Sequence, residues 1–157
     1  VTPRIARLKL TPAQPTVYQP SRIRPVQFGD AVELLDYDLA GTPRPGETIL
    51  VTLYWRALEP LKADYTVFVQ LLAPRSPLPW AQEDIQPRRG NYPTSLWEPD
   101  EVIVDPHQLQ LPDDLPPGEY SLAVGLYRLP TMDHLMVSGS GERLAILTEL
   151  SVNFSGG

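Results

Sequence analysis

Two segments of the chain begin with the same corner, Pro-Gly-Glu, and continue directly into alternating apolar residues. The first corner occupies residues 45–47, and the apolar positions after it are Ile49, Val51, Leu53 and Trp55. The second corner occupies residues 117–119 and is followed by Tyr120, Leu122, Val124 and Leu126. A period of two buries one face of a strand and leaves the other face to solvent, as in antiparallel sheets. The sequence therefore predicts an all-β domain.

The same alternation recurs along the chain and predicts eight or nine strands. They are expected at residues 5–10, 31–39, 48–57, 65–72, 80–85, 102–111, 120–127, 134–137 and 143–154. Residues 65–72 are apolar on both faces, so we expect a central strand there, with residues 80–85 returning antiparallel beside it. The last two strands are expected to form a hairpin. This pattern favours a two-sheet antiparallel β-sandwich of the immunoglobulin-like or jelly-roll kind.

Several positions predict local features of the strands. The change of apolar phase at Leu34 and Leu35 indicates a β-bulge or a strand buried on both faces, and Pro106 indicates an edge position or a bulge. Residues 86–100 have no period and are expected to form the main irregular loop, with one helical turn at residues 93–97. The final strand keeps a single apolar phase at Leu144, Ile146, Leu150, Val152 and Phe154. The second corner leads into a strand whose other face is small, so something can pack closely on Ser121, Ala123 and Gly125.

The chain has 157 residues and 17.5 kDa, which fits a single domain with a sizeable core. We expect a basic, proline-rich arm at residues 1–25, a sandwich core at 26–154 and a flexible tail at 155–157. The 19 prolines exceed the roughly 8 that average usage of about 5% would give, yet 42% hydrophobic residues argue against disorder. The start at Val1 and the Ser-Gly-Gly end indicate a fragment of a longer polypeptide.

Charge and composition exclude several classes of function. The net charge of −6 argues against a nucleic-acid partner, because phosphate binding needs clustered Lys and Arg. Five of the 13 basic residues lie in the first 24, which is consistent with a solvated surface or with contact to lipid headgroups. There is no Cys, and no apolar run is long enough to be a transmembrane segment.

The sequence presents no catalytic or metal-binding constellation. Three acidic pairs occur, Asp36 with Asp38, Glu83 with Asp84, and Asp113 with Asp114, and each is expected to be solvated or to cap a turn. His107 and His134 lack a second ligand at metal spacing and are expected at the surface or on an edge. We therefore predict no enzyme activity, no cofactor and no metal.

Aromatic residues near the irregular loop give the one candidate binding site. Exposed rings can stack on the apolar faces of sugars while nearby polar groups hydrogen-bond the hydroxyls. The residues proposed to bind a ligand are Trp80, Gln82, Arg88, Asn91, Tyr92 and Trp97, with Arg89 as a further polar neighbour. The alternative is that Trp80 and Trp97 cover the core beneath the loop. Trp55, in phase with the apolar positions of its strand, is expected in the core.

Four segments in fixed order resemble a known family. They are LLDYDL (34–39), RPGETILVTLYWRALEPLKADYTVFVQLL (44–72), NYPTSLWEPDEVIVD (91–105) and LPDDLPPGEYSLAVGLYRL (111–129). Together they resemble a soluble β-sandwich domain appended to bacterial multi-pass membrane proteins similar to lipid-linked-sugar glycosyltransferases of the mannosyltransferase type. The resemblance covers residues 30–129 and brings no catalytic residues with it. At the end of the TVFV strand this chain has Gln70 where the family often has His.

The resemblance implies a non-catalytic accessory domain on the non-cytoplasmic side of a membrane, attached through its parent protein. Its partner would be a glycan or a polypeptide substrate of that parent. The alternative is a secreted protein or lipoprotein that binds another protein through an open sheet edge. The oligomeric state stays open.

Overall fold

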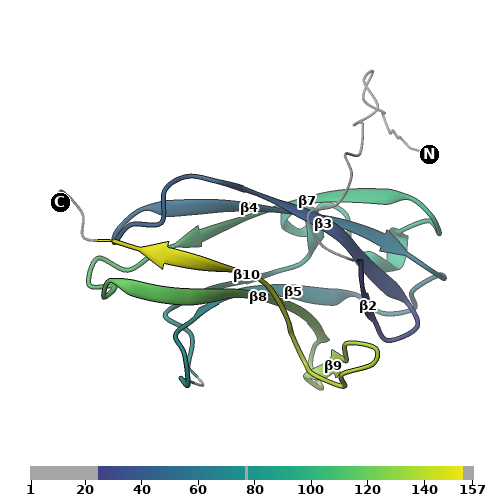
Figure 1. Ribbon diagram of the computed structural model, residues 1–157. Coiled ribbons are helices and arrows are strands. Elements are labelled where there is room, and N and C mark those ends of the chain that lie inside the picture. The colour runs from purple at the N-terminus through teal and green to yellow at the C-terminus, as the bar shows by residue number, and fades with distance from the viewer. Residues whose placement is uncertain (1–24, 77, 154–157) are drawn as a thin grey trace.

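The computed structural model describes residues 25–76 and 78–153, which form nine β-strands and two short 3-10 turns (Figure 1). The strands are β2 (Val26–Phe28), β3 (Val32–Ala40), β4 (Thr48–Ala57), β5 (Tyr65–Leu72), β6 (Ala81–Ile85), β7 (Val102–Gln110), β8 (Gly118–Arg128), β9 (Asp133–Leu135) and β10 (Ala145–Val152). The turns are η1 (Pro87–Gly90) and η2 (Thr94–Leu96). Neither turn is long and apolar enough to cross a membrane, and the described part of the chain has no other helix. The predicted tail, the strand at residues 5–10 and all of the predicted arm except residue 25 lie outside the described residues.

The strands pair into two antiparallel sheets, which confirms the predicted β-sandwich. The four-stranded sheet has the order β2-β3-β4-β7. The five-stranded sheet has the order β10-β8-β5-β6, and β9 also pairs with β8. As predicted, β5 lies between two neighbours and β6 returns antiparallel beside it.

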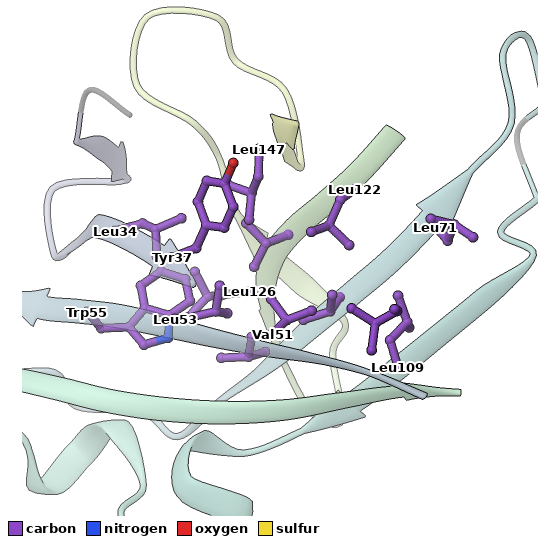
Figure 2. Packing of buried hydrophobic residues seen from close by; sticks show 14 of the residues in the cluster. Leu34, Tyr37, Val51, Leu53, Trp55, Leu71, Leu109, Leu122, Leu126 and Leu147 are labelled. Carbon is purple, nitrogen blue, oxygen red and sulfur yellow. The ribbon is translucent and has the colours of Figure 1, made fainter. Parts of the chain in front are cut away.

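The core lies between the sheets and is built by the two strands that follow the Pro-Gly-Glu corners. Ile49, Val51, Leu53 and Trp55 point inward from β4, and Tyr120, Leu122, Val124 and Leu126 point inward from β8. Figure 2 shows part of this packing, with β4 residues facing β8 residues. Fully burying one such side chain contributes about 1.5–3 kcal/mol, so the two patterns supply much of the stability.

Two of the predicted irregularities are confirmed. The register of β3 against β4 shifts between Leu34 and Asp36, which is the predicted bulge. Pro106 lies exposed on β7, the last strand of its sheet, opposite Thr52 of β4. A proline is tolerated there because an edge strand has one side without a ladder to complete. The irregular loop carries η2 at the position of the expected helical turn.

The prediction of a C-terminal hairpin is wrong. Both β9 and β10 pair with β8 along the same edge, β9 beside residues 126–128 and β10 beside residues 118–124. The 11 residues of β8 are long enough to accept two short strands one after the other.

The single apolar phase predicted for the last strand is also wrong. The register of β10 shifts between Ile146 and Thr148, so that Leu147 is 7% exposed and Ile146 is 50% exposed. A bulge adds one residue and moves the following side chains to the opposite face.

Candidate functional site

The two Pro-Gly-Glu corners lie at the same end of the sandwich, the end at which β10 finishes (Figure 1). Gly46 N donates to the Pro112 carbonyl at 3.1 Å, and Leu111 N donates to the Glu47 carbonyl at 2.9 Å. Just before the second corner, the Tyr120 hydroxyl donates to the Pro116 carbonyl at 2.6 Å. These bonds fix both corners relative to each other, so the loops between them have a defined shape.

A depression of about 710 Å³ opens at this end of the sandwich. Three segments line it: the loop before β4, the start of β8 and the end of β10. The lining residues are Thr42, Pro43, Arg44, Pro117, Gly118, Glu119, Ser151, Val152 and Asn153. The second corner is therefore part of the wall of the depression. The first corner begins at Pro45, directly after the lining residue Arg44.

The depression combines polar groups of several kinds with a few apolar surfaces. Glu119 is held by a hydrogen bond from the Ser151 hydroxyl, which fixes its carboxylate at the rim. The hydroxyl of Thr42, the guanidinium of Arg44 and the amide of Asn153 add donors and acceptors, while two prolines and Val152 add apolar surface. Small-molecule sites are usually concave and combine apolar surface with a few polar groups, so the depression is a candidate binding site.

The outer face of the five-stranded sheet continues from this rim as a hydrogen-bonded surface. Beside Glu119 in the ladder, the Ser121 hydroxyl donates to Glu149 Oε2 at 2.9 Å. At the far side of the sheet, Asp84 accepts from Gln82 Nε2 at 2.7 Å and from the Tyr127 hydroxyl at 2.8 Å. Burial, and then the hydrogen bond and the charge of Asp84, raise the pKa of Tyr127 to about 12.

Three rings gather on the same outer face. Phe68, Tyr127 and His134 have centroids 5.5–6.0 Å apart. The Phe68 ring lies over Gly125, where a Cβ atom would come within 2.3 Å of the Phe68 ring. The small face predicted on β8 is thus used to seat an aromatic side chain. Because Phe68 and Tyr127 are buried, these rings present little flat surface to a ligand.

A buried polar network lies where the edges of the two sheets meet. Asp105 and His107 of β7 are fully buried, and His107 Nε2 lies 2.6 Å from Asp105 Oδ2. The other ring nitrogen lies 3.2 Å from Glu83 Oε1 of β6. Trp55 Nε1 donates to Asp105 Oδ2 at 3.1 Å, which ties the network to the core. His107 lies on an edge strand, one of the two predicted places, but it is enclosed.

The same network fastens the η1 turn. Arg88 N donates to Asp105 Oδ1 at 2.7 Å, and Gln108 N donates to Glu83 Oε1 at 2.9 Å. Arg89 reaches the Glu83 carboxylate at 3.3 Å. Glu83 therefore accepts a backbone hydrogen bond from the edge of β7, as a neighbouring strand would, and this contact joins the two sheets at this side.

The predicted ligand residues divide into two groups, and the first lies in the core. Trp97 is 3% exposed, its ring centroid is 6.5 Å from that of Trp55, and its Nε1 donates to the Tyr92 carbonyl at 2.9 Å. Tyr92 is partly buried and donates its hydroxyl to Glu101 at 2.7 Å. Trp97 therefore covers the core, as in the alternative, and its ring does not offer a stacking surface. The apolar loop residues pack on the core because they shield the end of the sandwich from water.

The second group lies on the surface along β6 and η1. Trp80 is 38% exposed and directly precedes β6, and its backbone N–H donates to the Leu71 carbonyl at 2.8 Å. Gln82 is exposed on β6, and Arg88 and Asn91 are exposed on and after η1. These four residues follow one edge of the sandwich and do not line the depression.

The residues that line the depression were not predicted from the sequence. The signal that could have located them is the repeated corner itself. The strands that follow the two corners lie in facing sheets and start at the same end of the sandwich, so their corners meet there. Among residues 25–76 and 78–153, no cluster of three or more His, Asp or Glu side chains could hold a metal ion.

Comparison with protein-family models and with curated proteins gives no match. Among solved structures, the chain is similar to a Niemann-Pick type C2 protein from Japanese carpenter ant, with a TM-score of 0.56 and 7% identity over 81% of this chain and 99% of that chain. It is also similar to the C-terminal domain of wzt, with a TM-score of 0.53 and 12% identity over 88% of this chain and 83% of that chain. At these identities the likeness shows a shared β-sandwich fold.

Proposed function

We propose that this β-sandwich is a non-catalytic binding domain that holds a glycan in the depression between the two corners. The observation that carries the proposal is the set of lining residues, which bear a carboxylate, a guanidinium, an amide and two hydroxyls. A volume of about 710 Å³ lies within the range of roughly 300–1,000 Å³ found for ligand sites.

The chemistry of the lining suits a sugar. Adjacent hydroxyl groups on a sugar ring can each donate and accept, and they match planar carboxylate, amide and guanidinium groups such as those of Glu119, Asn153 and Arg44. The ring also has C–H faces, which can pack on Pro43, Pro117 and Val152. The Ser151 hydroxyl keeps Glu119 oriented before a ligand arrives, and such preorganisation reduces the entropic cost of binding.

The arrangement of the acidic groups supports binding without hydrolysis. Glycosidases use two carboxyl groups that flank the scissile bond, and Glu119 is the only carboxylate among the described residues that line the depression. A histidine does lie between two carboxylates elsewhere in the fold. This set, His107 with Asp105 and Glu83, is enclosed and already hydrogen-bonded. A substrate in the depression would meet none of these three groups, because none lines it.

The cellular context proposed for the domain rests on the sequence resemblance. We place it outside the cytoplasm, as an accessory domain of a bacterial envelope glycosyltransferase-like membrane protein, where it would hold the glycan or polypeptide substrate of its parent. The test adds protease to cells whose outer layers are permeabilised while the cytoplasmic membrane stays intact, and cleavage of the domain would support this location. Protection of the domain until the cytoplasmic membrane is broken would overturn it.

A second candidate is a protein contact at the free edge of β10. This strand ends its sheet and exposes half of Ile146. The bulge between Ile146 and Thr148 interrupts the ladder at the same place, and bulges are a common protection of edge strands against added strands. The depression is therefore the better supported site.

The test is a glycan-array screen of the 157-residue chain, followed by titration of any hit against variants. Arg44→Ala and Asn153→Ala should each weaken binding about tenfold, which corresponds to a loss of about 1.4 kcal/mol. Trp80→Ala serves as the matched control, because Trp80 is exposed but lies outside the depression. Loss of binding in Trp80→Ala alone would move the site to β6, and failure to bind any glycan would overturn the proposal.

A further inference from the structure

The η1 turn holds two consecutive arginines in an unusual backbone conformation. Arg88 has φ 54° and ψ 41°, and Arg89 has φ 56° and ψ 37°, which places both in the left-handed region. Residues other than glycine rarely adopt this conformation because it brings the Cβ atom close to the backbone. A strained backbone persists only where its surroundings enforce it, and such strain gathers at ligand-binding positions.

The strain in η1 is enforced by buried groups. The Arg88 N–H donates to Asp105 Oδ1 at 2.7 Å, and Asp105 is itself fixed by His107 and by Trp55. The turn is thus anchored from beneath through its backbone, which leaves the side chains of Arg88 and Arg89 exposed above it. The backbone anchor does not involve the Arg88 guanidinium, and the Arg89 guanidinium contacts the network only at Glu83.

Neither guanidinium is strongly engaged within the protein. Among the residues that the structure describes, Arg88 has no ion-pair partner. Arg89 approaches Glu83 at 3.3 and 3.5 Å, which is long for a charge-assisted hydrogen bond. Glu83 already accepts the Gln108 N–H at 2.9 Å and contacts the His107 ring, so it does not depend on Arg89. Arg89 can therefore turn to an external anion at little cost to the network.

We propose that η1 is a binding site for an oxyanion, either a carboxylate or a tetrahedral sulfate or phosphate group. Arg88 and Arg89 each expose a guanidinium whose fork of donors suits such groups, and the exposed amide of Asn91 follows them in the chain. On a chain of net charge −6, these two guanidinium groups outnumber Glu83, the one described carboxylate that forms an ion pair with them. The site is separate from the depression and does not depend on the glycan proposal.

The test uses sodium glucuronate and sodium sulfate as probes, followed by the backbone amide chemical shifts of Gln86 and residues 88–91. Sodium chloride at matched ionic strength controls for screening. We expect a saturable shift with at least one oxyanion and none with chloride. A response to glucuronate identifies a carboxylate ligand, and a response to sulfate identifies a tetrahedral one.

The variants Arg88→Asn and Arg89→Asn separate charge from backbone, because Asn tolerates the left-handed region and keeps the turn. Each should weaken oxyanion binding at least tenfold while the fold stays intact. Arg75→Asn is the matched control, since Arg75 is also exposed with φ 62° but lies in the connection between β5 and β6. No saturable shift, an equal shift with chloride, or equal binding by all three variants and the native chain would overturn the proposal.

Discussion

The indole nitrogen of Trp55 donates to Asp105 Oδ2 at 3.1 Å in the interior of the sandwich. This bond joins the apolar core to the polar network at the edge, because the same carboxylate oxygen lies 2.6 Å from His107 Nε2. A buried carboxylate is costly unless its lone pairs are occupied, and here the Arg88 N–H occupies the other oxygen. The network therefore links the stability of the core to the position of η1.

Removing His107 should strongly destabilise the protein. His107→Leu fills a similar space but takes away the partner 2.6 Å from Asp105 and the partner 3.2 Å from Glu83. Leaving buried carboxylates without a hydrogen-bond partner costs about 1–3 kcal/mol for each one, which denaturant unfolding would measure. His134→Leu is the control, because His134 is half-buried on the outer face and its ring packs against those of Phe68 and Tyr127. An equally small loss in both variants would show that the network adds little.

The three tryptophans should differ sharply in their contribution to stability. Trp55 is fully buried and Trp97 nearly so, and truncation of either to Ala should cost about 3–5 kcal/mol in unfolding free energy. Trp80 is partly exposed, so Trp80→Ala should cost much less, on the order of 0.5 kcal/mol. A small loss for Trp97→Ala would contradict its place over the core.

Stability should fall as the pH rises from about 10 to about 12. Burial and Asp84 raise the pKa of Tyr127 to about 12, and burial also raises the pKa of Tyr120 above 10.0. The folded state therefore keeps these phenols protonated, and the unfolded chain releases their protons near pH 10. The stabilisation is complete below pH 10 and is lost as the pH passes through the raised values. Unfolding free energies across this range should decline less steeply in Tyr127→Phe, and an unchanged slope would count against the raised pKa of Tyr127.

A methyl group at position 125 should not fit. The added Cβ of Gly125→Ala would lie 2.3 Å from a Phe68 ring carbon and 2.6 Å from the Arg143 carbonyl oxygen. Overpacking of this kind costs about 1–3 kcal/mol, which thermal or denaturant unfolding would detect. Ser121→Ala changes a nearby position on the same face of β8 without adding volume. If both variants unfold like the native chain, then Phe68 does not occupy the space over Gly125.

The sequence predicts β4 and β8 well because their alternation is long and each follows a corner. It also predicts the bulge in β3, where Leu34 and Leu35 break the phase, and the edge position of Pro106. Period alone says which face of a strand is buried but not which strand lies beside it. For that reason the pairing of β9 and β10 with β8 could not be predicted, and the bulge at residues 146–148 was missed.

The candidate site could be predicted only in part. Trp80, Gln82, Arg88 and Asn91 are exposed near β6, but Tyr92 and Trp97 turn inward because the open end of the sandwich needs an apolar cover. Composition cannot distinguish a ring that covers a core from one that meets a ligand. The depression joins residues 42–44, 117–119 and 151–153, and their proximity depends on sheet topology.

The most direct test of the account is to map the binding surface with amide chemical shifts as a glycan hit is titrated into the 157-residue chain. The account predicts saturable shifts that gather at Arg44, Glu119 and Asn153, with η1 unchanged by a neutral glycan. Shifts confined to the region of Trp80 and β6, or no saturable shift at all, would contradict the assignment of the depression as the glycan site.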